Sequence, residues 1–281
     1  MANTDLVISR HADVRAVLAD ERFAVPVAEG GARAGTLAWL RGAVCRFSEG
    51  AAHDRRLSVV VRSLDEADPA FLRRRAGERV LAGEAPDLAP ISALGEALGV
   101  TDLDALAGAV PAAASGYLTG NGRDGADAAV ATLARLLGPG PDEEVANRIA
   151  VYMQAYEATA GLVRKALPAS RRPEARGFPI EAVIAETLRF DPPVPAMRRV
   201  AREAAAVGDH EIAAGATVTL DLRAANRDPA VFAGPDRFDP ARREPRHLTF
   251  GAGRRPCPGA DQAVRLAAGV VEALNELESV R

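Results

Sequence analysis

The ten residues from Phe250 to Gly259, FGAGRRPCPG, combine one cysteine with three glycines and two arginines. Ionised Cys257 can bind a metal, and it can serve as the single protein ligand of a haem iron, to which a thiolate donates electron density. The glycines let the backbone adopt positive φ angles and approach a flat ring closely. Arg255 can hold a carboxylate, such as a haem propionate, through paired hydrogen bonds. The stretch therefore predicts a thiolate–haem loop.

The loop has simpler interpretations, which the composition makes less favourable. One is a glycine-rich surface turn that carries an ordinary half-buried cysteine. Zinc is disfavoured, because Cys45 and Cys257 are the only two cysteines and no nearby Cys or His completes a ligand cluster with the usual spacing. A disulfide is disfavoured because the chain shows no export signal.

Length and composition predict an ordinary globular protein. The chain has 281 residues, a formal net charge of −3, 48% hydrophobic residues and 26% charged residues. The small net charge gives no case for nucleic acid as a partner, and no apolar run is long enough to cross a membrane. Because the first residues also lack a signal-peptide pattern, we expect a cytoplasmic location.

Six positions of the loop agree in order with the haem-binding loop of the cytochrome P450 family, which this stretch resembles: Phe250, Gly251, Gly253, Arg255, Cys257 and Gly259. The resemblance implies haem b as cofactor, with Cys257 as its axial ligand. It implies that Phe250, Gly251 and Gly259 line the cofactor, and that the N–H of Gly259 points towards the sulfur, where a hydrogen bond tunes the potential.

The fold expected from this resemblance is mainly α with small β-sheets, formed by residues 1–281 as a single domain. The chain resembles a compact bacterial family member that is trimmed at the N-terminus, in the lid region and at the C-terminus. Hydrophobic periodicity predicts a strand over 6–9 and a strand pair over 207–222 that turns at Gly215. It predicts helices over 11–23, 52–63, 71–81, 142–167, 179–190 and 261–277, with a loop over 27–52 and weak helical periods over 105–141. The resemblance implies a further short helix over 91–100, which ends in the Leu-Gly-Val of the family pattern.

Further residues match family positions that hold the haem or support it. His53 and Arg199 are implied contacts of the propionates. Leu57 stands where the family has an arginine. Either Arg55 or Arg56 replaces that arginine, or the two form a solvated basic face. The Glu-x-x-Arg sequence of Glu186 and Arg189 is implied to form a buried ion pair that Arg237 completes. The NRDP sequence of residues 226–229 lies between this pair and the cysteine, in the order that the family has.

The helix over 142–167 resembles the family helix that crosses the distal side of the haem and carries an acid followed by an alcohol. Glu157 occupies the acid position, Ala158 stands at the usual threonine, and Thr159 follows. Glu157 and Thr159 are therefore the candidate catalytic residues that deliver protons. Thr159, Tyr156 or water can take over the role of the alcohol, or the substrate can supply it. Alternatively, the reaction is peroxide-driven, a cyclisation, a rearrangement or a dehydration.

By analogy with the family, we expect a monooxygenase that modifies a small molecule in bacterial secondary metabolism, with electrons from a ferredoxin or flavoprotein. The basic cluster Arg242, Arg243, Arg246 and Arg254 beside the loop can attract an acidic ferredoxin, or it is a solvated surface. A trimmed scaffold also favours a homodimer or a protein partner. A non-catalytic helper of another enzyme and a haem sensor are less favoured, because the cysteine and its arginines are retained.

Overall fold

The computed structural model describes residues 6–242 and 246–280. The chain forms two compact units. Unit 1 comprises Met1–Pro26 and Pro168–Cys257, and unit 2 comprises Val27–Leu167 and Pro258–Arg281. Neither unit is one continuous stretch of sequence. The single domain expected for the whole chain stays a prediction.

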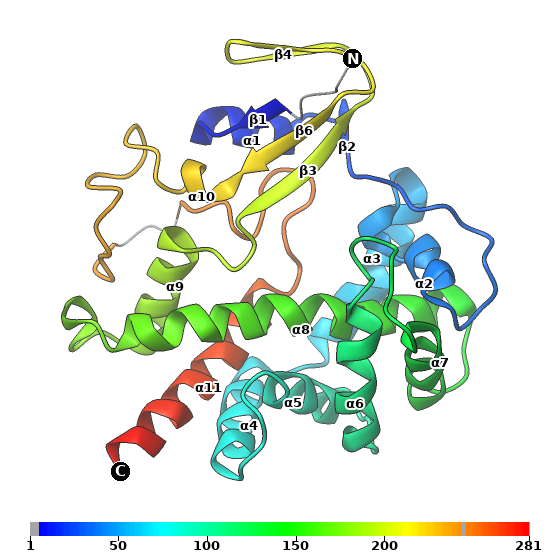
Figure 1. Ribbon diagram of the computed structural model, residues 1–281, viewed down its shortest axis with the longest axis vertical. Coiled ribbons are helices and arrows are strands. Elements are labelled where there is room, and N and C mark those ends of the chain that lie inside the picture. Colours follow the sequence, from blue (N-terminus) through cyan, green and yellow to red (C-terminus); the bar gives the residue numbers. More distant parts are fainter. Residues whose placement is uncertain (1–5, 243–245, 281) are drawn as a thin grey trace. The chain divides into compact units, whose positions relative to one another are not determined.

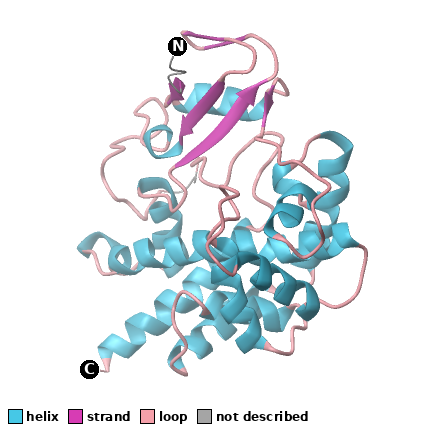
Figure 2. Ribbon diagram, turned by 45° about the vertical axis from the view of Figure 1, so that its right-hand side comes forward, coloured by secondary structure: helices cyan, strands magenta, loops and turns pink. Residues whose placement is uncertain are grey.

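Unit 1 contains a four-stranded sheet in the order β1-β6-β3-β2, which is visible in Figures 1 and 2. β1 (Leu6–Ile8) runs parallel to β6 (Thr217–Asp221), and β3 (Ala196–Ala201) runs antiparallel to both β6 and β2 (Phe23–Ala24). A separate hairpin joins β4 (Ala205–Val207) to β5 (His210–Ile212). The mainly helical fold with small sheets is as expected.

The prediction that two strands within residues 207–222 pair with each other is wrong. The chain does turn near Gly215, which has a φ of 79°. However, β5 and β6 on either side of this turn belong to different sheets, because β5 pairs with β4 and β6 pairs with β3. The alternation of apolar residues indicates that a segment is a strand, but it does not specify which strand is its neighbour.

Short helices complete unit 1. Helix α1 (His11–Ala19) buries Val14, Val17 and Leu18 in a core shared with the sheet. It ends earlier than the expected residue 23, because Phe23 and Ala24 form β2. Helix α9 (Ile180–Phe190) packs Val183 with Phe238 in a second cluster. The remaining helical segments of unit 1 are η2 (Pro173–Ala175) and α10 (Leu222–Ala225).

Unit 2 is helical in its described residues. Its helices are α2 (Leu37–Ala43), η1 (Cys45–Phe47), α3 (Gly50–Asp65), α4 (Pro69–Leu81), α5 (Ala89–Ala97), α6 (Leu103–Ala114), α7 (Ala126–Leu136), most of α8 (Asp142–Ser170) and α11 (Ala260–Ser279). The loop expected over 27–52 was wrong for α2 and η1. Thr36 caps α2 by accepting a hydrogen bond from the Trp39 N–H, a signal that the Gly- and Ala-rich composition obscured.

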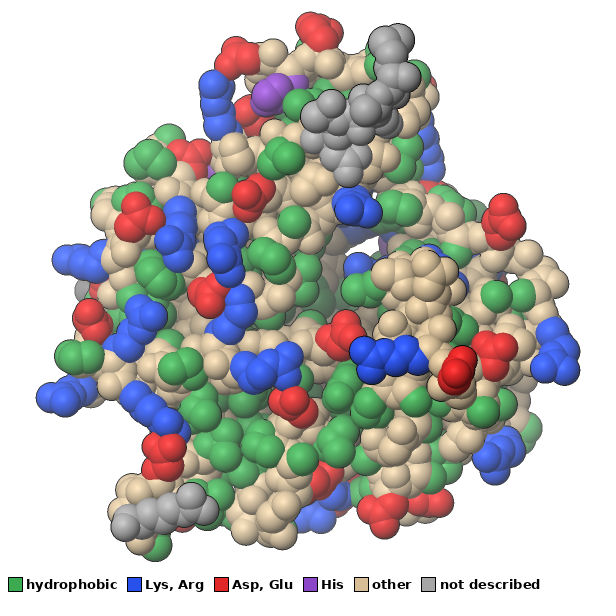
Figure 3. Space-filling view, in the orientation of Figure 1, with side chains coloured by type: hydrophobic (Ala, Val, Ile, Leu, Met, Phe, Trp, Pro, Cys, Tyr) green, Lys and Arg blue, Asp and Glu red, His purple; other side chains and the backbone are tan. Residues whose placement is uncertain are grey.

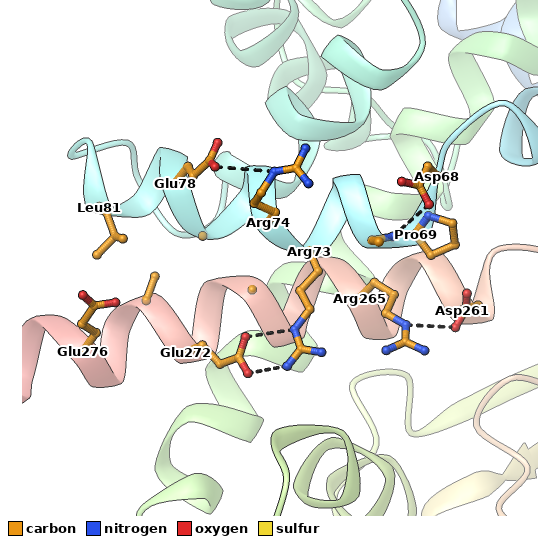
Figure 4. Close-up of a pocket in the computed structure, with 14 residues that line it drawn as sticks. Asp68, Pro69, Arg73, Arg74, Glu78, Leu81, Asp261, Arg265, Glu272 and Glu276 are labelled. Atoms are coloured by element: carbon orange, nitrogen blue, oxygen red, sulfur yellow. Dashed lines mark hydrogen bonds and ion pairs between the residues drawn. The ribbon is translucent and has the colours of Figure 1, made fainter.

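The closest helix contact in unit 2 joins α4 to α11, which lie side by side in Figure 4. A Cβ added to Gly269 would lie 1.9 Å from the Arg73 carbonyl oxygen, and one added to Gly77 would lie 3.0 Å from the Gly269 carbonyl oxygen. The two glycines therefore let the backbones touch. Arg73 and Glu272 form an ion pair across the same face, with an Nη2–Oε1 distance of 2.5 Å.

Among the residues that the structure describes, none of the helices is both long enough and apolar enough to span a bilayer. The 29 residues of α8 exceed the length needed, but charged and polar side chains recur along it.

Candidate active site

The loop that precedes and includes Cys257, residues 250–257, is called the cysteine loop below. Gly251 and Gly253 have φ angles of 73° and 65°, a conformation that L side chains rarely adopt. A Cβ at Gly253 would lie 2.6 Å from the Leu18 carbonyl oxygen, and one at Gly251 would lie 3.0 Å from that of Arg255. Both glycines are thus required by backbone conformation and by close approach.

Cys257 carries an exposed thiol that is not part of a disulfide. Its backbone N–H donates to the Phe250 carbonyl oxygen at 2.7 Å, which closes the loop onto itself. In the described part of the chain, His, Cys, Asp and Glu do not gather in a group of three or more that could hold a metal ion. One exposed sulfur in a loop closed by a backbone hydrogen bond suits a metal whose other ligands come from a macrocycle, so the donor set fits haem.

The start of the cysteine loop packs near a buried histidine. The rings of Phe250 and His247 are 5.8 Å apart between centroids, and the Nδ1 atom of His247 is buried. Burial lowers the pKa of His247 to about 4, and repulsion from Arg189 contributes. His247 is therefore a neutral imidazole at neutral pH.

The two arginines of unit 1 that are predicted to bind propionates lie in different settings. Arg199 is 8% exposed and lies in β3, where it pairs with Val218 of β6. Its Nη1 donates to the Arg198 carbonyl oxygen at 2.8 Å. Arg255 is half-buried within the cysteine loop. Their roles toward a propionate stay predictions.

The buried ion pair expected from the Glu-x-x-Arg sequence is present in unit 1. Arg189 Nη2 lies 2.6 Å from Glu186 Oε1 and Arg189 Nε lies 2.8 Å from Oε2, with side chains 2% and 3% exposed. The remaining guanidinium hydrogens go to the carbonyl oxygens of Asn226, Pro235 and Arg237. Such saturation is what a buried ion pair needs to offset its desolvation.

The third member of this network differs from the expectation. Arg237 directs its side chain to Asp239 at 2.8 Å and contributes only its carbonyl oxygen to the pair. Arg242 instead places its Nε 3.3 Å from Glu186 Oε1. The loop between Phe232 and Arg242 decides which arginine returns to the carboxylate, and sequence order alone does not specify that path.

The basic cluster expected beside the cysteine loop is therefore smaller than predicted. Arg242 is only 16% exposed and serves the buried pair, whereas Arg246 and Arg254 are exposed. Arg243 lies outside the described residues. Figure 3 shows Lys and Arg side chains on one face of the molecule, with Asp and Glu side chains among them.

In unit 2, helix α3 carries His53 and the two arginines that follow it. His53 Nδ1 lies 3.0 Å from Asp54 Oδ1, and the side chain of His53 is 13% exposed. Arg55 and Arg56 both bind Glu143 of α8, at 2.7 Å and 2.9 Å. Hydrogen bonds from Arg55 and then Arg56 hold the pKa of Glu143 at about 2. The two arginines therefore tie α3 to α8. The side chain of Arg56 is 15% exposed, whereas that of Arg55 is 61% exposed and remains solvated.

The two candidate proton groups lie on different sides of α8. Glu157 is exposed, Ala158 is half-buried, and Thr159 is 1% exposed with a hydroxyl that has no hydrogen-bond partner among the residues that the structure describes. Positions two apart in an α-helix differ by about 200° around its axis. Glu157 and Thr159 therefore do not form the adjacent acid–alcohol pair of the resemblance. Their catalytic roles stay predictions.

Two polar residues of unit 1 were not among the sequence-predicted site residues. Asn226 is fully buried and its amide binds the segment that leads into the cysteine loop. His11 is 4% exposed and binds the same segment through the Arg246 carbonyl oxygen at 2.8 Å. The NRDP sequence was the available signal for Asn226, whereas His11 had none beyond its place at the start of a helix.

A groove that does not include the cysteine loop lies in unit 2. It has a volume of about 710 Å³ and runs between α4 and α11 (Figure 4). Its charged residues pair with one another, as in Arg74–Glu78 and Arg265–Asp261. It contains none of the sequence-predicted site residues.

The comparisons with a family model and with curated proteins point to the same family. Residues 180–265 match the family model described as Cytochrome P450. The chain is 42% identical over 91 residues to cyclomarin C epoxidase CymV of Salinispora arenicola, which covers 32% of this chain and 23% of that protein. It is 37% identical over 93 residues to tabersonine 3-oxygenase of Catharanthus roseus, which covers 28% and 18%. The matches thus span less than a quarter of these two curated relatives.

Solved structures extend the likeness to the fold. The crystal structure of P450BioI in complex with an acyl carrier protein that bears hexadec-9Z-enoic acid has a TM-score of 0.73 and 23% identity. The match covers 97% of this chain and 84% of that one. At this identity the comparison establishes the fold, which agrees with the mainly helical architecture with small sheets.

Proposed function

Because the chain belongs to the cytochrome P450 family, we propose that it is a haem-thiolate oxidoreductase with Cys257 as the axial ligand. The observation that carries this proposal is the cysteine loop, where two glycines at positive φ and the bond from Cys257 N–H to Phe250 present one exposed thiol. When bound, haem would supply oxygen activation at an iron that a thiolate makes electron-rich. The residues of this chain would hold and protect that group.

The cofactor-binding residues that we propose come from both the loop and other elements. Cys257 would bind the iron, while Phe250, Gly251 and Gly259 would line the ring. The cationic side chains Arg199 and Arg255, together with His53, would hold the propionates as charge-assisted hydrogen-bond donors. Arg55 and Arg56 are not included, because both bind Glu143.

Glu157 is the proposed proton-delivering group. Its carboxyl is exposed, so it can exchange protons with water, and the acid position of the family sequence falls on it. Thr159 is a second candidate, supported by its buried hydroxyl without a partner. Leaving such a hydroxyl unpaired costs about 1–3 kcal/mol, and a functional role is one reason why a protein retains it.

The proposed reaction is monooxygenation of a small molecule, with electrons from a ferredoxin or another donor. The role in bacterial secondary metabolism is proposed by analogy with relatives such as cyclomarin C epoxidase CymV of Salinispora arenicola. The separation of Glu157 from Thr159 and the presence of Ala158 favour one alternative, a redox-neutral or peroxide-driven reaction that does not depend on an acid–alcohol pair.

The test is turnover of candidate small molecules by the haem-loaded protein under isotopically labelled dioxygen, with a ferredoxin and its reductase. Monooxygenation predicts that the label enters the product and that product formation needs the electron donor. Product that forms without the donor and without the label would favour the alternative chemistry. If the loaded protein transformed none of the candidates under either condition, the enzymatic proposal would lose its support.

The Thr159→Val variant tests the second proton group. Valine has the shape of threonine without the hydroxyl, so we expect the variant to gain about 1 kcal/mol of unfolding free energy. If the hydroxyl delivers protons, turnover falls while the stability rises. If turnover equals that of the parent protein, Thr159 has no catalytic role.

A further inference from the structure

The segment that leads into the cysteine loop, residues 246–249, is held by one buried amide. Asn226 is fully buried. Its Oδ1 accepts a hydrogen bond from the Leu248 N–H at 2.7 Å, and its Nδ2 donates to Thr249 Oγ1 at 2.9 Å. Thr249 Oγ1 in turn donates to the Leu188 carbonyl oxygen at 2.6 Å. The amide therefore fixes two consecutive residues to helix α9.

The same NRDP sequence is also linked, through His11, to the start of this segment. The Asp228 carboxylate accepts from the His11 backbone N–H at 2.9 Å. The His11 ring binds the Arg246 carbonyl oxygen at 2.8 Å, and because a carbonyl can only accept, Nε2 is the donor. Asn226 thus binds Leu248 directly, and Asp228 is linked through His11 to Arg246, two residues earlier in the same segment.

The cysteine loop continues from these anchored residues by short hydrogen bonds. The Leu248 carbonyl oxygen accepts from the Gly251 N–H at 2.8 Å, and the Phe250 carbonyl oxygen accepts from the Cys257 N–H at 2.7 Å. A shift of Leu248 would therefore pass to Gly251 and Phe250, and from Phe250 to Cys257. All of these residues belong to unit 1.

We propose that Asn226 is a positioning residue for Cys257, which acts through Leu248 and Thr249 and fixes where the thiol is presented. It touches neither substrate nor cofactor in this role. The part of the proposal that concerns the iron rests on the proposed function, whereas the part that concerns the thiol does not. The competing interpretation is a buried amide that contributes only to stability.

The chain offers a matched control for that interpretation. Asn147 of unit 2 is also fully buried, and its side chain also makes hydrogen bonds to the backbone, with Cys45, Ala43 and Glu143. Both asparagines can be replaced by leucine, which has the same branching at Cγ but carries methyl groups in place of the polar oxygen and nitrogen. Both variants lose stability, but only Asn226→Leu should affect Cys257.

The first experiment uses the full chain without haem, in a Cys45→Ala background so that alkylation reports Cys257 alone. Asn226→Leu should change the alkylation rate of Cys257 by about tenfold, the factor that corresponds to one lost buried hydrogen bond. Asn147→Leu should leave the rate within about twofold of the parent. Equal rates in the two variants, or an unchanged rate in Asn226→Leu, would overturn the positioning role.

If Asn226→Leu does not fold, Thr249→Val provides a milder test with its own control. Thr249→Val removes the hydroxyl that links Asn226 to Leu188, and Thr187→Val removes a buried hydroxyl that donates to the Val183 carbonyl oxygen at 2.7 Å. Only the first should alter the alkylation rate, by about threefold. The same rate in both threonine variants would contradict the proposal.

The second experiment uses the haem-loaded proteins, reduced and exposed to carbon monoxide. Asn226→Leu should lose part of the red-shifted Soret band of thiolate ligation, whereas Asn147→Leu should retain it at equal haem content. A full red-shifted band in Asn226→Leu would overturn positioning toward the iron. An unshifted band in the parent protein would instead refute the proposed function, and the alkylation rates would still decide the role of Asn226.

Discussion

The cysteine loop and the middle of α8 differ in how their polar groups are held. Around the loop, Asn226, Thr249 and the Glu186–Arg189 pair are buried and hydrogen-bonded. On α8, Glu157 is exposed and the Thr159 hydroxyl is buried without a partner. The comparison indicates that buried hydrogen bonds hold the loop of the proposed metal ligand. Among the described residues, the proposed proton groups Glu157 and Thr159 take part in no comparable network.

The largest effect should follow from removal of the metal ligand itself. Cys257→Ala should abolish the red-shifted Soret band and all turnover, because the chain offers no replacement sulfur in the loop. The measurement is the spectrum of the reduced protein with carbon monoxide. Cys45→Ala, which alters the buried thiol of unit 2, is the control and should keep the band. A red-shifted band in Cys257→Ala would refute the ligand assignment.

The network under the loop should be the next most sensitive part. Arg189→Met leaves Glu186 buried with fewer partners, so we expect a loss of about 3–5 kcal/mol in unfolding free energy, measured by denaturant titration. Arg74→Met breaks an exposed pair with Glu78 and should cost less than about 1 kcal/mol. A similar loss of unfolding free energy in both variants would show that the buried pair near the loop contributes no more to stability than the exposed pair on α4.

The same titration separates Arg242 from Arg237. Arg242→Met removes a contact to the buried Glu186 and should destabilise the protein by about 1–3 kcal/mol. Arg237→Met removes an exposed contact to Asp239 and should cost less than about 1 kcal/mol. The opposite order would restore Arg237 as the third member of the network.

The exposed acid of α8 should affect rate but not folding. Glu157→Gln should lower turnover by about a hundredfold and leave haem content and the Soret band unchanged, because general acid catalysis contributes about that factor. Glu144→Gln, at an exposed position in the first turn of α8, is the control. Turnover of Glu157→Gln at the parent rate would remove Glu157 from the mechanism.

The smallest effect concerns the attachment of α3 to α8 and depends on pH. Arg55 and Arg56 lower the pKa of Glu143 from 4.5 to about 2, so its contribution to stability is present above pH 4.5 and is lost as the pH falls towards 2. Glu143→Gln should therefore be less stable than the parent at neutral pH, by less than about 1 kcal/mol, and equally stable near pH 2.

Denaturant titrations across this pH range measure the difference. Glu144→Gln should show no such dependence, because Glu144 is exposed in the same turn and forms no ion pair among the described residues. A constant difference between Glu143→Gln and the parent protein would contradict the assignment of the ion pairs.

Sequence reasoning was most successful where chemistry restricts the backbone. Of the three loop glycines that were expected to allow positive φ, Gly251 and Gly253 adopt it, whereas Gly259 has a φ of −100°. The Glu186–Arg189 pair was also predicted and is present. Positive φ is a local requirement that leaves a readable sequence pattern. The spacing places Glu186 and Arg189 on one helix face, whereas the burial of the pair was implied by the family resemblance.

The features that sequence reasoning missed depend on contacts between distant segments. The choice of Arg242 over Arg237 depends on the path of a loop, and the role of Asn226 depends on Leu248, 22 positions away. Helix α2 was missed because Gly and Ala give a weak periodic signal, although Thr36 marks its start. The pairing of β6 with β3 could not be read from alternation alone.

The most direct test of the central claim is the spectrum of the purified, haem-loaded protein after reduction and exposure to carbon monoxide. A strongly red-shifted Soret band that disappears in Cys257→Ala is the predicted result, because it requires an iron bound by the Cys257 thiolate. A protein that binds no haem, or one whose band is unshifted, would contradict the assignment of the cysteine loop as a thiolate–haem site.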